Sequence, residues 1–258
     1  MKSPYNWVGN KYKHLDIINK IVKDKQYDDV VEGFMGTGNI LLNLECNANR
    51  YIGNDKIKLL PSVYERIKEM ESFDKHCIER ILNRWNRFSS KEDYYNFRKH
   101  WNSRYLNNRI DDMFIYETAM LLKMCSNSMV RFNSKGELKN TLNSKNFEFV
   151  TGDILGLEVG KNDLIILDPP YILRNDMYSM DYTKQHDDFL LKLLDSNSCD
   201  FLYFNYLERD GVVFDELQEL IDKHNFNVIE LASSTCTGQN RTGSKEVKEV
   251  LITNMEVR

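Results

Sequence analysis

Short apolar segments that alternate with amphipathic segments are the feature that most constrains how this chain can fold. The predicted strands are rich in aliphatic and aromatic residues, and they cover about 27–34, 50–55, 147–153, 163–167, 199–207, 226–234 and 249–257. The predicted helices among them cover about 39–47, 184–196 and 213–225. Strands that alternate with helices indicate βαβ units and a mostly parallel sheet, so we expect an α/β fold.

The alternation is broken once, between Asp55 and Phe147. Four segments there space their apolar residues at helical intervals, and they cover about 59–70, 76–88, 91–106 and 111–125. The segment 128–142 resembles a β-hairpin that turns at residues 134–136. We therefore expect a helical module with one hairpin, residues 58–145, inserted into a catalytic domain made of residues 1–57 and 146–258.

Charge is distributed unevenly between these two parts. From Lys58 to Glu148 the chain has 17 basic and 12 acidic residues, whereas the remainder has 18 basic and 27 acidic residues. A basic module on an acidic body suits phosphate binding. Charge alone does not decide between phosphate binding and the alternative, which is a helical module whose charged faces are simply solvated.

Several classes of protein do not fit the sequence. No apolar run approaches the roughly 20 residues of a membrane span, and the N-terminus lacks the apolar core of a signal peptide. The five cysteines are scattered without a C-x-x-C pair, and the five histidines have no metal-ligand spacing. There is no phosphate-binding P-loop and no G-x-S-x-G elbow. We expect a cytoplasmic protein of a bacterial cell or a phage-infected host, without a metal.

The stretch "DLIILDPPYIL", residues 163–173, ends a predicted buried strand with an acid and two prolines. Proline fixes its own φ and disfavours helix at the preceding residue, so Asp168 and Pro169 are both held extended. The result is a rigid step that presents a carboxylate, a backbone carbonyl and the ring of Tyr171. The alternative is a strand that simply stops, with Asp168 solvated.

Other predicted strands also end in residues that suit a ligand. In open α/β sheets, ligands bind beyond the carboxyl ends of the strands. Gly36 and Gly38 follow the first strand and allow a tight turn, although they do not form a G-x-G-x-x-G fingerprint. Asp55 could accept from the hydroxyls of a ribose, and Asp153 from the amino group of an adenine. Either acid could equally be a helix cap, but together they favour a nucleoside cofactor.

Four motifs in this order resemble those of one enzyme family. They are "NWVGNKYKHL" (6–15), "EGFMGTG" (32–38), "VRFNSKGEL" (130–138) and "DPPY" (168–171). The set is similar to the motifs of the Dam-type (D12 class, alpha group) DNA adenine-N6 methyltransferases, which use S-adenosylmethionine. The resemblance implies a Rossmann-like, seven-stranded mixed sheet of the class I S-adenosylmethionine-dependent methyltransferase type, with a DNA-recognition module where the basic insertion lies.

The resemblance also implies roles for individual residues. The implied catalytic residues are Asp168, Pro169, Pro170 and Tyr171. The implied cofactor-binding residues are Trp7, Lys11, Glu32, Phe34, Gly36, Gly38, Asp55, Asp153 and Asp168. The implied DNA-binding residues are Arg131, Asn133, Met129, Asn127, Lys135, Arg84, Arg87 and Lys99. Asn6, Asn10, Ser126 and Asn140–Asn143 depart from the family pattern, so the recognition sequence stays open and GATC is only one alternative.

The implied chemistry is methylation of an amino group. The lone pair of adenine N6 is delocalised into the ring. Two acceptors that bind the two amino hydrogens would therefore help to make this lone pair available for methyl transfer. Asp168 Oδ and the Pro169 carbonyl can be those acceptors, while Tyr171 stacks on a base flipped out of the duplex. The implied partners are double-stranded DNA, with the enzyme as a monomer or as a dimer on DNA, and a cognate restriction endonuclease. S-adenosylhomocysteine is the implied product.

Three rival interpretations remain from the sequence. The same acceptor pair serves cytosine N4, rRNA adenine and protein glutamine in other transferases, which usually begin the motif with Ser or Asn. A catalytically idle nucleic-acid-binding protein on this scaffold is the runner-up from another class. A nicotinamide dehydrogenase is a third, although the glycine spacing does not fit it.

Overall fold

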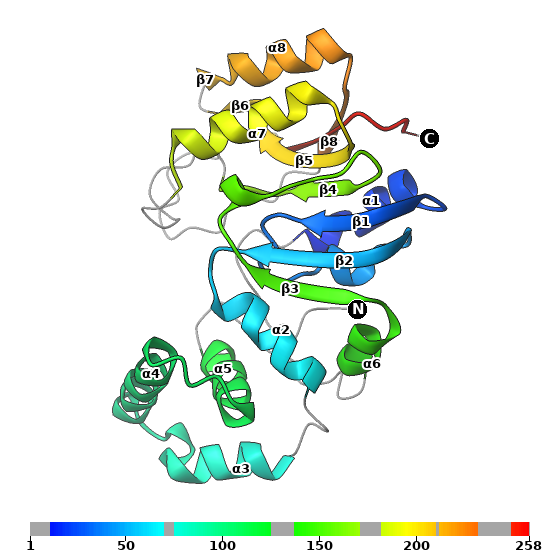
Figure 1. Ribbon diagram of the computed structural model, residues 1–258. Helices are drawn as coiled ribbons and strands as arrows, with labels where there is room; N and C mark the ends of the chain where they lie inside the picture. Colours follow the sequence, from blue (N-terminus) through cyan, green and yellow to red (C-terminus); the bar gives the residue numbers. More distant parts are fainter. Residues whose placement is uncertain are drawn as a thin grey trace. The chain divides into compact units, whose positions relative to one another are not determined.

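The computed structural model describes residues 11–69, 75–124, 137–170, 182–209, 212–231 and 249–257. Hydrogen bonding orders its main strands as a seven-stranded sheet, β3-β2-β1-β4-β5-β9-β8, which confirms the predicted α/β fold with a mixed sheet (Figure 1). The strands are β1 (Gln26–Glu32), β2 (Asn47–Asp55), β3 (Phe147–Thr151), β4 (Leu164–Leu167), β5 (Asp200–Tyr206), β8 (Asn227–Leu231) and β9 (Glu249–Thr253). A small pair, β6 (Glu208–Arg209) and β7 (Val212–Val213), lies outside this sheet.

Parallel pairing places the carboxyl ends of paired strands next to each other. β1 pairs in parallel with β4, β4 with β5, and β2 with β3. β9 runs antiparallel to both of its neighbours, β5 and β8. Every residue of β4 is buried, which explains why this strand has a continuous apolar sequence rather than an alternating one.

The helices agree with most of the predicted ones. They are α1 (Leu15–Val22), α2 (Leu59–Glu69), α3 (Lys75–Arg84), α4 (Lys91–Leu106), α5 (Asp112–Met124), α6 (Glu137–Ser144), α7 (Lys184–Ser196) and α8 (Asp215–His224), with single 3₁₀ turns η1 (Tyr12–His14), η2 (Leu41–Asn43), η3 (Asn86–Phe88) and η4 (Ile154–Gly156). The four predicted helices between Asp55 and Phe147 correspond to α2, α3, α4 and α5. All of α2 to α6 lies between β2 and β3 in the chain.

Two predictions were wrong in the described residues. The predicted helix at 39–47 is only the 3₁₀ turn η2, because its apolar side chains are buried all around rather than along one stripe: Ile40, Leu41, Leu42, Leu44 and Cys46 are each at most 5% exposed. The second half of the predicted hairpin is the helix α6. Its sequence begins Glu-Leu-Lys, which are good helix formers, and Leu142 is buried.

The chain forms two compact units, which we describe separately. Unit 1 contains residues 1–13, 35–43 and 51–151, and unit 2 contains residues 14–34, 44–50 and 152–258. In unit 2 an apolar core joins β4, β5 and β9 to helices α7 and α8, which pack against each other. Figure 1 shows these two helices side by side.

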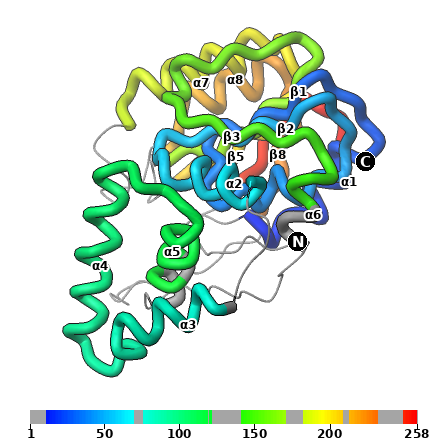
Figure 2. The backbone as a smooth tube through the Cα atoms, turned by 60° about the horizontal axis from the view of Figure 1, so that its bottom comes forward, coloured from blue at the N-terminus to red at the C-terminus, as the bar shows by residue number. Residues whose placement is uncertain are grey.

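In unit 1 helix α2 contacts β3, α5 and α6, and helices α3, α4 and α5 form a small helical group (Figure 2). Aromatic rings fill the centre of this group. The ring of Phe97 contacts those of Trp85 and Phe88, and Trp101 stacks on Phe114 with ring centroids 5.2 Å apart. These contacts give the helical group an aromatic core.

No helix within the described ranges is long and apolar enough to cross a membrane.

Candidate functional site

The proline step follows directly on the buried strand β4 in unit 2. Pro169 is buried, and Asp168 and Pro170 are half-buried. Beside this step, the Gly33 N–H donates to the Ile166 carbonyl at 2.8 Å and so continues the pairing of β1 with β4. A Cβ on Gly33 would lie 2.7 Å from Ile154 Cδ1 and 3.1 Å from Leu167 Cδ2. Glycine therefore lets the ends of these segments approach closely.

Asp153 lies at the start of the turn η4, also in unit 2. Its Oδ1 accepts from the Leu155 N–H at 3.1 Å, so the residue is the cap that the sequence left open as an alternative. The carboxylate has a second partner as well, because Nε2 of the buried His186 lies 3.2 Å from Asp153 Oδ1. Capping and ligand binding are compatible, since a carboxylate accepts from several donors at once.

An aromatic group surrounds His186. Tyr182 stacks on the imidazole with ring centroids 4.9 Å apart, and its hydroxyl donates to Asp187 Oδ1 at 2.8 Å. Phe34, from the segment after β1, meets Tyr182 edge-on at 6.1 Å. Burial raises the pKa of the Asp187 carboxyl, and the hydrogen bond from Tyr182 opposes that rise. Phe34 and Asp153 are thus linked through Tyr182 and His186.

The glycine turn and Asp55 belong to unit 1 and are bonded to each other. Gly36 and Gly38 have φ values of 50° and 62°, in the left-handed region that favours glycine. The Gly36 N–H donates to Asp55 Oδ2 at 2.8 Å, and the Ile57 N–H donates to Asp55 Oδ1 at 2.8 Å. The carboxylate at the end of β2 therefore fixes the glycine turn that precedes it in the chain.

Asp55 is only 9% exposed. Burial raises the pKa of its carboxyl, while the hydrogen bonds from Ile57 and Gly36 partly oppose that rise. Lys11, in the same unit, is 5% exposed, and Glu32, in unit 2, is 3% exposed. A buried carboxylate beside a glycine turn suits a ligand with two vicinal hydroxyls, because one carboxylate can accept a hydrogen bond from each of them.

The basic residues of the insertion fall into two groups. Arg84, Arg87 and Lys99, which were predicted to bind DNA, are exposed. Arg87 pairs with Glu79 at 3.3 Å, and both side chains are more than half exposed, so this pair is weak.

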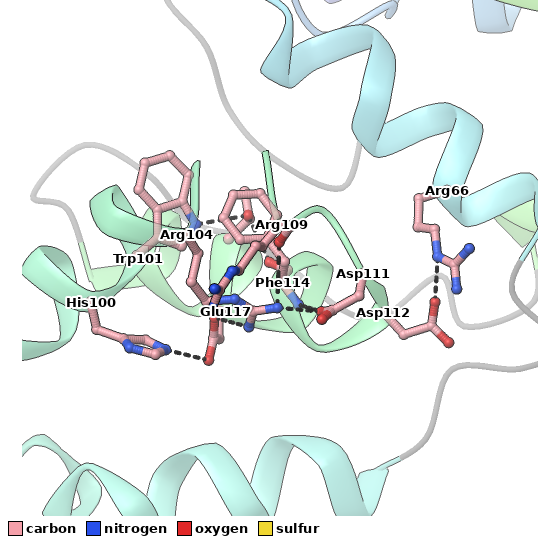
Figure 3. Close-up of polar contacts among 10 residues, drawn as sticks. Arg66, His100, Trp101, Arg104, Arg109, Asp111, Asp112, Phe114 and Glu117 are labelled. Atoms are coloured by element: carbon pink, nitrogen blue, oxygen red, sulfur yellow. Dashed lines mark hydrogen bonds and ion pairs between the residues drawn. The ribbon is translucent and has the colours of Figure 1, made fainter. Parts of the chain in front are cut away.

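Arg104 differs from these exposed residues. Its side chain is 13% exposed, and its guanidinium donates to the buried Glu117 carboxylate at 2.6 Å and to Asp111 (Figure 3). His100 Nε2 lies 3.3 Å from the same Glu117. An arginine held by two carboxylates between α4 and α5 stabilises the helical group instead.

Several predicted site residues lie outside the described residues. They are Trp7, Tyr171, Asn127, Met129, Arg131, Asn133 and Lys135. Their predicted roles stay predictions.

The sequence did not single out His186, which contacts Asp153, or Tyr182, which stacks on the imidazole. A single histidine without a metal-ligand spacing has no pattern of its own. One signal was present, because Thr183 and His186 have the spacing of a capping box, in which the third helical side chain bonds back to the N-cap.

The comparison with protein families decides where this chain belongs. The family model described as "D12 class N6 adenine-specific DNA methyltransferase" matches residues 7–145, more than half of the chain. The chain belongs to this family. The matched stretch contains Lys11, Gly36, Gly38 and Asp55, whereas Asp153 and Asp168 follow it in the sequence.

Two curated relatives extend the similarity along the rest of the chain. The type II methyltransferase M.FokI of Planomicrobium okeanokoites is 27% identical over 290 aligned positions, which cover 98% of this chain and 43% of the relative. The modification methylase StsI of Streptococcus sanguinis is 25% identical and covers 100% of this chain and 43% of the relative. The chain thus spans less than half the length of these relatives.

Solved structures are more distant. An rRNA methylase from Streptococcus thermophilus aligns with 96% of this chain and 98% of its own, at 11% identity and a TM-score of 0.39. This likeness is too remote to bear on function.

Proposed function

We propose that this chain transfers a methyl group from S-adenosylmethionine to N6 of an adenine in double-stranded DNA. The observation that carries the proposal is the Asp168-Pro169-Pro170 step at the end of the buried strand β4, in a chain of the D12 family. Because the named relatives are more than twice as long, the activity of the whole protein is proposed from the family rather than from any one relative.

Residues of each unit, taken separately, have properties that support their proposed roles in binding the cofactor. Gly36 and Gly38 make a turn without side chains, and the buried Asp55 carboxylate suits the ribose hydroxyls. The Asp153 carboxylate suits the adenine amino group, while Lys11, Glu32 and Phe34 complete the proposed set, with Trp7 from the sequence motif. The bound cofactor supplies an electrophilic methyl on a sulfonium, and S-adenosylhomocysteine is the product.

The chain's own residues would prepare the target nitrogen. Asp168 Oδ and the Pro169 carbonyl each accept one hydrogen of the adenine amino group, so the nitrogen lone pair turns out of the ring plane. Proline fixes both acceptors beforehand, and this preorganisation avoids a reorganisation cost during the reaction. Tyr171 would stack on the flipped base and hold it against these acceptors.

We further propose that residues 58–145 contact DNA and that residues 1–57 and 146–258 form the catalytic domain. Arg84, Arg87 and Lys99 would bind phosphates, while Arg131, Asn133, Met129, Asn127 and Lys135 would lie nearest the bases. One curated relative, StsI, is named a modification methylase and the other, M.FokI, a type II methyltransferase, and these names support a cognate restriction endonuclease as a partner. The enzyme would act as a monomer or as a dimer on DNA, in the cytoplasm of a bacterial cell or an infected host.

Transfer of a radiolabelled methyl group from S-adenosylmethionine to duplex DNA tests the activity. The proposal predicts label in the DNA that depends on the protein and increases with time. Binding of DNA without any incorporation of label would instead support the idle DNA-binding protein.

A further inference from the structure

His186 is a buried histidine that connects a helix start to a proposed cofactor residue. It is the third residue of α7, and its side chain is 7% exposed. One ring nitrogen faces the N-cap residue Thr183, and the other faces Asp153. Which of these two nitrogens carries the proton decides whether the imidazole can donate a hydrogen bond to the Asp153 carboxylate.

The backbone of Thr183 determines where the ring proton lies. Its N–H points at His186 Nδ1 at 3.0 Å, and an N–H can only donate, so Nδ1 must be the acceptor. The Thr183 carbonyl is farther from Nδ1, at 3.3 Å, and already accepts from the His186 N–H at 2.9 Å. A neutral imidazole has a single N–H, which is therefore on Nε2.

The Nε2–H can then donate to Asp153. Nε2 lies 3.2 Å from Oδ1 and 3.4 Å from Oδ2, so the ring bridges the two carboxylate oxygens. The Leu155 N–H holds Oδ1 at the same time. Stacking of Tyr182 on the imidazole fixes the plane of the ring, and the Tyr182 hydroxyl is itself anchored on Asp187.

We infer that His186 is a positioning residue, which orients the Asp153 carboxylate to accept from the 6-amino group of the cofactor's adenine. The inference rests on the proposed function, because it takes Asp153 as the adenine contact. A carboxylate held from two sides keeps one rotamer, and it can then discriminate a 6-amino purine from a 6-oxo purine. The 6-oxo group presents an acceptor to an acceptor, which the site rejects.

Two substitutions separate the contributions of the two hydrogen bonds that the imidazole makes, one with Thr183 and one with Asp153. In His186→Asn the side-chain oxygen lies near the position of Nδ1, so it can still accept from Thr183, but no donor reaches Asp153. In His186→Gln the side-chain amide lies near the position of Nε2, so it can still donate to Asp153, but the bond to Thr183 is lost. Thermal unfolding of each variant checks that it is folded.

The probes are S-adenosylhomocysteine and its 6-oxo analogue, S-inosylhomocysteine, and their affinities are measured by isothermal titration calorimetry. The wild-type protein is expected to prefer the 6-amino ligand by at least about tenfold, which corresponds to roughly 1.4 kcal/mol. His186→Asn is expected to lose most of this preference, and His186→Gln to keep most of it. If His186 served only to stabilise the helix, its substitution would weaken the binding of both ligands equally and leave the ratio of their affinities unchanged.

The results also separate this inference from the proposed function. A folded His186→Asn variant with the wild-type preference overturns the inference, and so does a folded His186→Gln variant that loses the preference. If Asp153→Asn keeps the preference, the proposed adenine contact itself is wrong. If the wild-type protein does not bind S-adenosylhomocysteine, the proposed cofactor is wrong.

Discussion

The Asp55 carboxylate accepts from two backbone N–H groups, those of Gly36 and Ile57, and it is nearly buried. One side chain thus fixes the glycine turn and is the proposed partner of the cofactor's ribose. Its burial has a consequence for binding, because the pKa of this carboxyl lies above the ordinary value for aspartate, about 3.9. The ionised form accepts hydrogen bonds from hydroxyls better than the protonated form does.

We therefore predict that affinity for S-adenosylhomocysteine falls as the pH is lowered, and that the fall begins at a higher pH than for an ordinary aspartate. The sign follows from the raised pKa, since protonation of Asp55 occurs earlier on acidification and removes the preferred acceptor. Calorimetric titrations between pH 4 and pH 7 measure this, with Asp55→Asn as the control. If the wild-type protein and Asp55→Asn show the same pH dependence, Asp55 does not contact the ribose.

Single residues also show where sequence reasoning stops. The prediction for Asp168 and the two prolines rests on their own chemistry, because prolines dictate local backbone geometry. His186 could not be predicted, since its role depends on the position of Asp153, which is 33 residues earlier in the chain. The pairing of Arg104 with Glu117 could not be predicted either, because it depends on how α4 packs against α5.

At the scale of elements, the buried Glu117 organises the helical group of unit 1. It accepts from Arg104 Nη1 at 2.6 Å and lies 3.3 Å from His100 Nε2, so two side chains of α4 share one carboxylate (Figure 3). Trp101 Nε1 donates to the Thr118 hydroxyl at 2.9 Å in the same interface between α4 and α5. Polar side chains therefore fix the register of these two helices beside their aromatic core.

We predict that Glu117→Gln lowers the free energy of unfolding by about 3 kcal/mol, because it removes the buried carboxylate that pairs with Arg104 and leaves only the exposed Asp111 as a charged partner. Urea unfolding followed by circular dichroism measures the change. Glu79→Gln is the matched control, since Glu79 pairs with Arg87 at the surface, and it should cost less than about 1 kcal/mol. Equal effects of the two substitutions would show that Glu117 has no special role.

Periodicity predicted the elements better than it predicted their ends. The strands of the sheet follow from short segments rich in apolar residues, and helices α2, α3, α4, α5, α7 and α8 follow from the helical spacing of apolar residues. The segment 39–47 was misread because a fully buried irregular segment is as apolar as a helix. Residues 137–142 were misread because the turn signal at residues 134–136 outweighed their helical propensity.

At the scale of the whole molecule, the uneven distribution of charge bears on DNA binding. The basic residues Arg84 and Lys99 are exposed in the inserted segment, whereas the rest of the chain is acidic. Contacts with phosphates release counterions from DNA, so each contact adds to the salt dependence of the affinity.

We predict that the double variant Arg84→Ala/Lys99→Ala weakens binding to any DNA sequence and reduces the slope of log affinity against log salt by roughly 2. Fluorescence anisotropy over a series of salt concentrations measures the slope. Lys192→Ala, which removes an exposed lysine of α7 outside the insertion, is the control and should leave the slope unchanged. An unchanged slope in the double variant would place the phosphate contacts elsewhere.

The most direct measurement of the central claim identifies the methylated atom. Duplex DNA is incubated with the protein and S-adenosylmethionine, digested to nucleosides and analysed by mass spectrometry, in parallel with a folded Asp168→Ala variant. The account predicts N6-methyladenine with the wild-type protein and a rate at least about 10²-fold lower with the variant. N4-methylcytosine in place of N6-methyladenine, or substantial turnover by Asp168→Ala, would contradict it.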